Sequence, residues 1–191
     1  MIRKIFFVTS NAEKVAEVRK VFDDFNLDIN VEQKSLDIVE PDLDCLEDIA
    51  VSKVTQAFKL LKKPCFVEDS GIFFKAYKNF PGPISSRVFK SIGYEGIFNL
   101  LKGKNKDAFF EAVIAFKPNK EEYFIFKGKV FGKIIDQIKG KSSARMPYDS
   151  IFVPYGYRNT FAELGKEIKN KISHRRKAAE KFAKFLKRYL K

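Results

Sequence analysis

The stretch "IRKIFFVTSNAEKVAEVRKVF", residues 2–22, decides the fold class because an apolar strand runs directly into a helix. Residues 2–9 have the composition of a short buried strand. Ser10 or Asn11 can cap the helix that follows. The apolar side chains of that helix recur at helical spacing, at Val15, Val18, Val21, Phe22 and Phe25. A strand that feeds a capped amphipathic helix is the first half of a βαβ unit.

The same order then repeats along the chain. Residues 27–36 alternate as a strand does, and residues 44–63 form a second amphipathic helix that Pro64 ends. Residues 65–70, "CFVEDS", are a further strand. This alternation predicts an α/β fold built from βαβ units.

The second half of the chain has a different pattern. A short helix around residues 94–103 precedes two strand-like runs, 108–118 and 121–135, which predict an antiparallel hairpin. Residues 139–160 are rich in Gly, Pro and Ser and predict a long loop of the kind that often carries function. Residues 173–190 predict a final helix with an apolar face.

Composition limits the possible classes of protein. The chain has 191 residues, 45% hydrophobic residues and a net charge of +13, which favours a globular domain with anionic partners. No apolar run reaches the roughly 20 residues that span a bilayer, and the first residues lack a secretory signal. With Cys45, Cys65 and a single histidine, a zinc site is not expected. We therefore expect a reduced, cytoplasmic protein that does not enter a membrane.

Two adjacent carboxylates, Glu68 and Asp69, end the apolar strand and are followed by Ser70 and Gly71. Ligands of open α/β sheets bind beyond the carboxyl ends of the strands. Carboxylates at that edge can hold Mg²⁺, which takes one or two acidic ligands and leaves its other positions to water and phosphate. Asp, Ser and Gly are also turn residues, so an ordinary turn is the alternative interpretation.

The first loop, "TSNAEK" at residues 9–14, is a candidate phosphate site. It joins a strand to a helix, and the backbone N–H groups of a helix N-terminus bind anions. Lys14 lies in the first helical turn, where the helix dipole disfavours a cation, so a bound anion would explain it. The alternative is a solvated surface lysine beside an ordinary cap.

A third candidate is the start of the last helix. Ser173 is a potential cap, and His174, the only histidine, is followed there by Arg175. Arginine presents a rigid fork of donors that can grip the acceptor-rich edge of a base. The alternative is a plain helix start in a basic protein. Together, an acidic metal site, a phosphate site and a donor cluster indicate a nucleotide and Mg²⁺.

Six short motifs follow one another along the chain: Thr9-Ser10-Asn11-Ala12-Glu13-Lys14, Glu68-Asp69-Ser70-Gly71, Pro81 to Arg87, Phe126 to Ile134, Tyr148 to Phe152 with Thr160 to Glu163, and Lys169 with Ser173-His174-Arg175. In these motifs the chain resembles the inosine triphosphate pyrophosphatase family, also called Ham1 or RdgB-like, over nearly its whole length.

The resemblance implies an elongated α/β fold of two lobes, a mixed sheet flanked by helices with a central nucleotide-binding cleft. One domain would span residues 1–191, with residues 1–75 plus 140–191 in one lobe and residues 76–139 contributing the second. It implies a homodimer that hydrolyses ITP, dITP and XTP to the monophosphate and pyrophosphate with Mg²⁺, a nucleotide-pool house-cleaning role.

The resemblance also implies roles for single residues. Thr9, Ser10, Asn11 and Lys14 would seat the triphosphate, with Lys53 as a further phosphate contact. Glu40 and Asp69 would hold Mg²⁺, Asp69 would also be the general base, and Ser70 would lie beside the ligand. The residues that would surround the base are Met146, Tyr148, Asp149, Lys169, His174 and Arg175. A donor such as Arg175 favours the C6 oxygen of hypoxanthine or xanthine over the amino group of adenine.

The chain departs from the family pattern in one place. Met146-Pro147 stands where the family usually has an aromatic residue that stacks on the base. Methionine can still cover a purine face, but it is more adaptable than phenylalanine. A pyrophosphatase of the same fold that acts on modified pyrimidine nucleotides is therefore an alternative.

Another alternative is a nucleic-acid-binding protein that uses the last helix, with Arg176, Lys177, Lys181, Lys184, Lys187 and Arg188. Nucleic acid is the less expected partner, because such binding gives no reason for Glu68 and Asp69 to lie beside a phosphate site.

Overall fold

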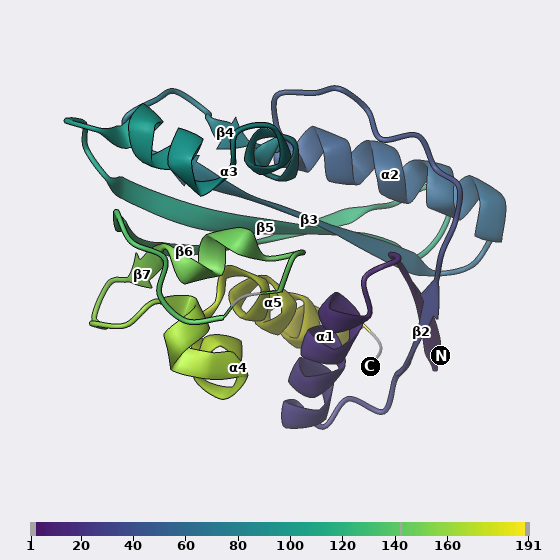
Figure 1. Ribbon diagram of the computed structural model, residues 1–191. Helices are drawn as coiled ribbons and strands as arrows, with labels where there is room; N and C mark the ends of the chain where they lie inside the picture. Colours follow the sequence, from purple (N-terminus) through teal and green to yellow (C-terminus); the bar gives the residue numbers. More distant parts are fainter. Residues whose placement is uncertain (1–2, 142, 190–191) are drawn as a thin grey trace. The chain divides into compact units, whose positions relative to one another are not determined.

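The computed structural model describes residues 3–141 and 143–189, which form strands and helices in the alternation that the sequence predicts (Figure 1). The elements are β1 (Lys4–Val8), α1 (Ala12–Asp24), β2 (Asn30–Lys34), α2 (Leu46–Leu61), β3 (Cys65–Phe74), β4 (Pro81–Gly82), α3 (Ser85–Leu101), β5 (Asp107–Lys117), β6 (Phe124–Ile134), the 3₁₀ helix η1 (Pro147–Ser150), β7 (Phe152–Pro154), α4 (Phe161–Ile172) and α5 (His174–Tyr189). The predicted α/β class is confirmed. Residues 2, 142 and 190 of the predicted elements lie outside the described residues.

The strands form one mixed sheet of order β2-β1-β3-β5-β6-β7, with β4 paired to β3. β1 runs parallel to both β2 and β3, as a chain of βαβ units requires. The pairs β3–β4 and β6–β7 are antiparallel. The strand that the sequence predicted to end at residue 70 continues to Phe74, so Asp69 lies in the middle of β3. It follows the residues of β3 that pair with β1, and β1 ends at Val8, just before the first loop.

The chain divides into two units. Unit 1 comprises Met1–Asp69, Ala112–Gly128 and His174–Lys191, and unit 2 comprises Ser70–Glu111 and Lys129–Ser173. These boundaries differ from those of the expected lobes, since residues 112–128 belong to unit 1 and residues 140–173 to unit 2. The reason is that β3, β5 and β6 each pass from one unit into the other, so no loop or change of composition marks the boundary.

The core of unit 1 lies between the sheet and two helices. α1 and α5 are side by side, and their apolar faces pack on Ile5, Phe7 and Phe66 (Figure 1). α2 covers the opposite face of the sheet (Figure 1). Gly128 allows α5 to begin against β6, because a Cβ at this position would lie 2.1 Å from the His174 carbonyl oxygen.

The core of unit 2 gathers apolar residues of α3, η1 and α4 on one face of its strands, where Ile72, Phe74, Phe110, Val130 and Ile134 point. α3 begins nearer the N-terminus than the sequence predicted, because a kink at Gly93 joins two helical segments. α4 was not predicted. It begins at Thr160 with a capping box, in which the Thr160 hydroxyl accepts from the Glu163 N–H and the Glu163 carboxylate accepts from the Thr160 N–H. None of the helices among residues 3–141 and 143–189 has the length and apolarity to cross a bilayer.

Candidate active site

The loop between β1 and α1 forms an ordered turn at a helix N-terminus. Asn11 is the N-cap, and its Oδ1 accepts from the backbone N–H groups of Glu13 at 3.0 Å and Lys14 at 3.4 Å. Thr9 Oγ1 accepts from the Asn11 N–H at 3.1 Å, while Ser10 is exposed. This turn holds polar side chains and the positive end of the α1 dipole at one edge of the sheet, as an anion site requires.

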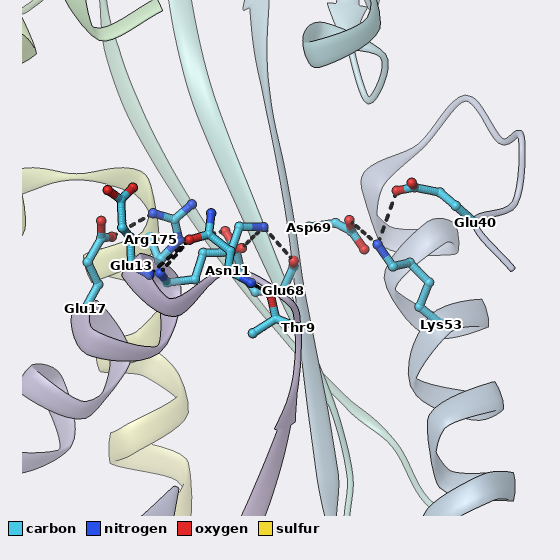
Figure 2. A network of polar contacts seen from close by, with 10 residues as sticks. Thr9, Asn11, Glu13, Glu17, Glu40, Lys53, Glu68, Asp69 and Arg175 are labelled. Atoms are coloured by element: carbon cyan, nitrogen blue, oxygen red, sulfur yellow. Dashed lines mark hydrogen bonds and ion pairs between the residues drawn. The ribbon is translucent and has the colours of Figure 1, made fainter. Parts of the chain in front are cut away.

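Glu68 lies at the centre of a buried ionic network within unit 1 (Figure 2). Lys14 Nζ is 2.5 Å from Glu68 Oε2 and also donates to the Glu68 carbonyl at 3.1 Å. Arg175 donates from Nε to Glu68 Oε1 at 3.0 Å and from Nη1 to Glu17 Oε2 at 2.7 Å. The counter-charge of Lys14 in this structure is thus Glu68, and this network ties α1 and α5 to β3.

Asp69 faces a different set of partners. Lys53 of α2 donates from Nζ to Asp69 Oδ1 at 2.8 Å and to Glu40 Oε1 at 3.2 Å, so one ammonium bridges two carboxylates (Figure 2). Glu40 is largely exposed, whereas the side chain of Asp69 is 12% exposed. Asp69 Oδ2 is buried and has no hydrogen-bond partner.

The two adjacent carboxylates therefore lie on opposite faces of β3, because side chains alternate along a strand. Glu68 points with Phe66 toward α1 and α5, and Asp69 points with Cys65 and Val67 toward α2. The expectation that Glu68 shares a metal with Asp69 finds no support in this geometry, since Lys14 and Arg175 take the Glu68 carboxylate.

The pKa values of the two carboxylates shift in opposite directions. Burial acts to raise the pKa of Glu68, but Arg175 and Lys14 outweigh it and lower that pKa to about 2. Burial raises the pKa of Asp69, and Lys53 and Lys14 compensate only in part. Glu68 is thus a permanent anion of the structure, whereas Asp69 is the carboxylate whose environment favours taking up a proton.

A second polar cluster lies within unit 2. Lys169 of α4 forms a buried ion pair with Asp149 and is 3.0 Å from the Met146 sulfur. Two tyrosines hold the segment that contains these residues: Tyr148 donates its O–H to the Ser85 carbonyl at 3.0 Å, and Tyr94 donates to the Pro147 carbonyl at 2.9 Å. The Met146–Asp149 segment is therefore fixed by α3 and α4 rather than being a free loop.

The model of the Ham1 family matches residues 5–185, almost the whole chain. The chain belongs to the Ham1 family. It is similar to a dITP/XTP pyrophosphatase of Thermococcus kodakarensis, at 43% identity over 98% of this chain and 100% of that protein. It is also similar to a dITP/XTP pyrophosphatase of Methanopyrus kandleri, at 40% identity over 96% of both chains.

Solved structures of Ham1 proteins have the same fold. A HAM1 protein of Coxiella burnetii superposes with a TM-score of 0.86 at 28% identity, over 98% of this chain and 100% of that chain. The Ham1 protein of Staphylococcus aureus gives a TM-score of 0.83 at 28% identity, over 97% and 99% of the two chains.

The residues expected from the Ham1 resemblance fall into both units. Unit 1 contains Thr9, Ser10, Asn11, Lys14, Glu40, Lys53, Asp69, His174 and Arg175, and unit 2 contains Ser70, Met146, Tyr148, Asp149 and Lys169. At the start of α5, His174 and Arg175 are both buried. Sequence reasoning missed Glu17, which pairs with Arg175, and Tyr94, which holds Pro147. Glu17 could have been predicted as part of the network, because it lies one helical turn after Lys14. No feature of the sequence indicated the contact of Tyr94.

The site residues of this Ham1 protein fit a divalent cation. Mg²⁺ needs only one or two carboxylates, and Glu40 and Asp69 are already joined through a single positive charge, that of Lys53. The buried Asp69 Oδ2 that accepts no hydrogen bond is a suitable ligand atom. Within the described residues no three His, Cys, Asp or Glu side chains gather into a metal cluster, so water and phosphate oxygens would complete the coordination.

Proposed function

We propose that this chain hydrolyses the non-standard purine nucleoside triphosphates dITP, ITP and XTP to the monophosphate and pyrophosphate. The observation that carries the proposal is the environment of Asp69, a buried carboxylate with a raised pKa, one oxygen without a hydrogen bond and a lysine on the other. The similarity to proteins named dITP/XTP pyrophosphatase supports the choice of substrate.

In the proposed reaction, a water molecule attacks the α-phosphorus and its oxygen forms the new P–O bond. The bond between the α-phosphorus and the oxygen that bridges to the β-phosphorus breaks, and pyrophosphate leaves with that electron pair. Asp69 accepts the proton of the water and later returns it to solvent. A buried carboxylate whose pKa is raised can serve as such a base.

The residues of unit 1 would handle the charge of the triphosphate. The N-terminus of α1, with Thr9, Ser10, Asn11 and Lys14, would bind its phosphates, and Lys53 would leave Asp69 to contact them. Glu40 and Asp69 would hold Mg²⁺, which when bound neutralises charge that develops on the phosphate oxygens. Asp42 and Asp44 lie in the same loop as Glu40 and are the alternative second ligand.

In this proposal, polar residues near the end of the chain recognise the base. Lys169 and Arg175 are cationic donors that suit the C6 oxygen of hypoxanthine or xanthine and repel the amino group of adenine. Met146 would cover a face of the purine, with Tyr148, Asp149, His174 and Ser70 as further contacts. The buried Lys169–Asp149 pair fixes the lysine in place.

The test is pyrophosphate release from dITP, ITP, XTP, GTP, ATP and dUTP in the presence of Mg²⁺. It compares the wild type with Asp69→Asn and with Asp28→Asn, a matched control in an exposed loop of unit 1. We expect the wild type and the control to prefer dITP, ITP and XTP. Asp69→Asn should lose about 10²-fold or more of kcat, the usual contribution of a general base.

Other outcomes would change the proposal in different ways. Activity that favours dUTP would keep the mechanism and overturn the substrate. Pyrophosphate from none of the six nucleotides would overturn the enzymatic proposal. Full activity of Asp69→Asn would overturn the role of Asp69 alone. A homodimer and a cytoplasmic location remain predictions, which the resemblance and the two free cysteines support.

A further inference from the structure

Several residues of unit 2 that are proposed to contact the base lie on a short segment with little internal support. Met146 directly precedes η1, and Asp149 lies within it. A single 3₁₀ turn has poorer hydrogen-bond geometry than an α-helix, and methionine is an adaptable side chain with three rotatable bonds. Contacts from other elements must therefore fix this segment if it is to distinguish one base from another.

Tyr94 of α3 supplies one such contact. Its O–H donates to the Pro147 carbonyl at 2.9 Å. The proline ring fixes the φ angle of Pro147, and a hydrogen bond to its carbonyl fixes the peptide plane that follows, and hence ψ. The two soft dihedral angles of Pro147 are thus set, one by its ring and the other by Tyr94. The course of the backbone from Met146 to Asp149 therefore depends on the Tyr94 hydroxyl.

The ring of Tyr94 is itself held in place. Gly93, at φ 59°, kinks α3 immediately before Tyr94, a conformation that glycine adopts readily. The Tyr94 ring packs edge-on against Phe89, with centroids 4.8 Å apart, and Phe89 packs against Tyr148 of η1 at 5.5 Å. A packed aromatic cluster therefore presents the hydroxyl, and replacing Tyr94 by phenylalanine removes the hydrogen bond while it keeps this packing.

Lys169 of α4 depends on the same segment. It is buried, pairs with Asp149 and lies 3.0 Å from the Met146 sulfur, so a shift of the backbone moves both partners of this lysine. Lys169 is one of the cationic donors proposed for the C6 oxygen of the base. Displacing it should weaken the binding of ITP more than that of ATP, whose C6 carries an amino group.

We propose that Tyr94 is a positioning residue for base selection: its hydroxyl fixes the Pro147 peptide and thereby sets the position of residues 146–149 against the purine. The inference rests on the proposed function, because it concerns residues proposed to contact the base. It deepens that function by naming a residue that determines selectivity through the backbone of its neighbour.

The test is isothermal titration calorimetry with ITP and with ATP, in EDTA, for the wild type, Tyr94→Phe and Tyr77→Phe. Both nucleotides carry the same ribose and triphosphate, so the ratio of their dissociation constants reports the base. Tyr77 is the matched control, a half-buried tyrosine of unit 2 whose O–H donates to the Leu100 carbonyl at 2.7 Å.

We expect Tyr94→Phe to reduce the preference for ITP over ATP by about 5-fold, the effect of losing one hydrogen bond, and Tyr77→Phe to leave this preference unchanged. Urea unfolding should show a similar loss of stability in the two variants, since each loses one hydrogen bond to a carbonyl. In hydrolysis of ITP with Mg²⁺, Tyr94→Phe should raise KM by about 5-fold and keep kcat, because the residue acts on binding of the base.

An unchanged preference for ITP in Tyr94→Phe would overturn this inference. So would an equal loss of preference in Tyr77→Phe, or a wild type that binds ITP and ATP equally. Failure of the proposed function gives a different result, because binding is measured without hydrolysis. A wild type that releases no pyrophosphate with Mg²⁺, but whose preference for ITP falls only in Tyr94→Phe, would overturn the enzymatic proposal and support the role of Tyr94.

Discussion

Replacing Glu68 by glutamine should remove much of the stability that the Glu68 network gives to unit 1. Glutamine keeps the size of the side chain but removes the charge that Lys14 and Arg175 share. The variant leaves Arg175, which is buried, and Lys14, which is partly buried, with fewer counter-charges, and breaking a buried ion pair from one side is strongly destabilising.

The size of the expected stability loss follows from the pKa of the Glu68 carboxyl. Lys14 and Arg175 lower the pKa of the Glu68 carboxyl from 4.5 to about 2 against the opposing effect of burial. At about 1.4 kcal/mol for each pKa unit, the ionised Glu68 contributes on the order of 3 kcal/mol to the free energy of unfolding at pH 7. Because the folded pKa lies below the unfolded value, this contribution is present above pH 4.5 and is lost as the pH falls through about 2. At pH 3 the contribution should be less than half as large, on the order of 1 kcal/mol.

The assay is urea unfolding of the wild type and Glu68→Gln at several pH values between 7 and 3, followed by circular dichroism. Glu32→Gln is the control, because Glu32 also contacts two lysines, Lys4 and Lys34, but at the surface. We expect Glu68→Gln to be less stable than the wild type by about 3 kcal/mol at neutral pH, and the difference to shrink as the pH falls. Glu32→Gln should change little at any pH.

A Glu68→Gln variant that is as stable as the wild type at pH 7 would refute this reasoning, and so would a loss that does not change with pH. The first result would mean that Lys14 and Arg175 do not depend on the Glu68 charge. The second would mean that the cost comes from packing.

Two further predictions concern the other charged clusters. Because the pKa of Asp69 is raised above 3.8, its ionised form is costly in the folded protein, so Asp69→Asn should raise the free energy of unfolding at pH 7. The variant should lose this advantage below pH 4, where Asp69 is protonated in both states. Urea unfolding at pH 7 and pH 3.5 measures the difference, and a variant less stable than the wild type at pH 7 would contradict the prediction. Lys169→Met should lower the free energy of unfolding by about 3–5 kcal/mol, since it leaves Asp149 as a buried charge without its lysine. Lys171→Met, at an exposed lysine of the same helix, is its control and should cost little in the same unfolding assay.

The sequence was sufficient to predict the regular part of the fold. The apolar periodicity of residues 4–24 and the cap at Asn11 gave β1 and α1, and the paired runs around residue 120 gave the β5–β6 hairpin. These features are local, so a short window contains the information that determines them. The capping box at Thr160 was equally local, and α4 could have been predicted from it.

The division into units and the partners of the charged residues could not be predicted in this way. Arg175 and Glu68 are 107 residues apart, and nothing in either motif shows that they pair. Because Glu68 and Asp69 are adjacent in sequence, we interpreted them as one acidic motif. Only the alternation of a strand, together with knowledge of which helices cover each face, separates their surroundings.

The opposite orientation of Glu68 and Asp69 has a consequence for how this protein can change. Position 68 secures the docking of α1 and α5, while position 69 faces the residues proposed for chemistry. Neighbouring positions in the chain are therefore under different constraints: a variant at 69 changes the partner of Lys53, whereas a variant at 68 changes the counter-charge of Lys14 and Arg175, which are themselves proposed to bind the nucleotide. An insertion or deletion of one residue in β3 would exchange the two positions and lose both at once.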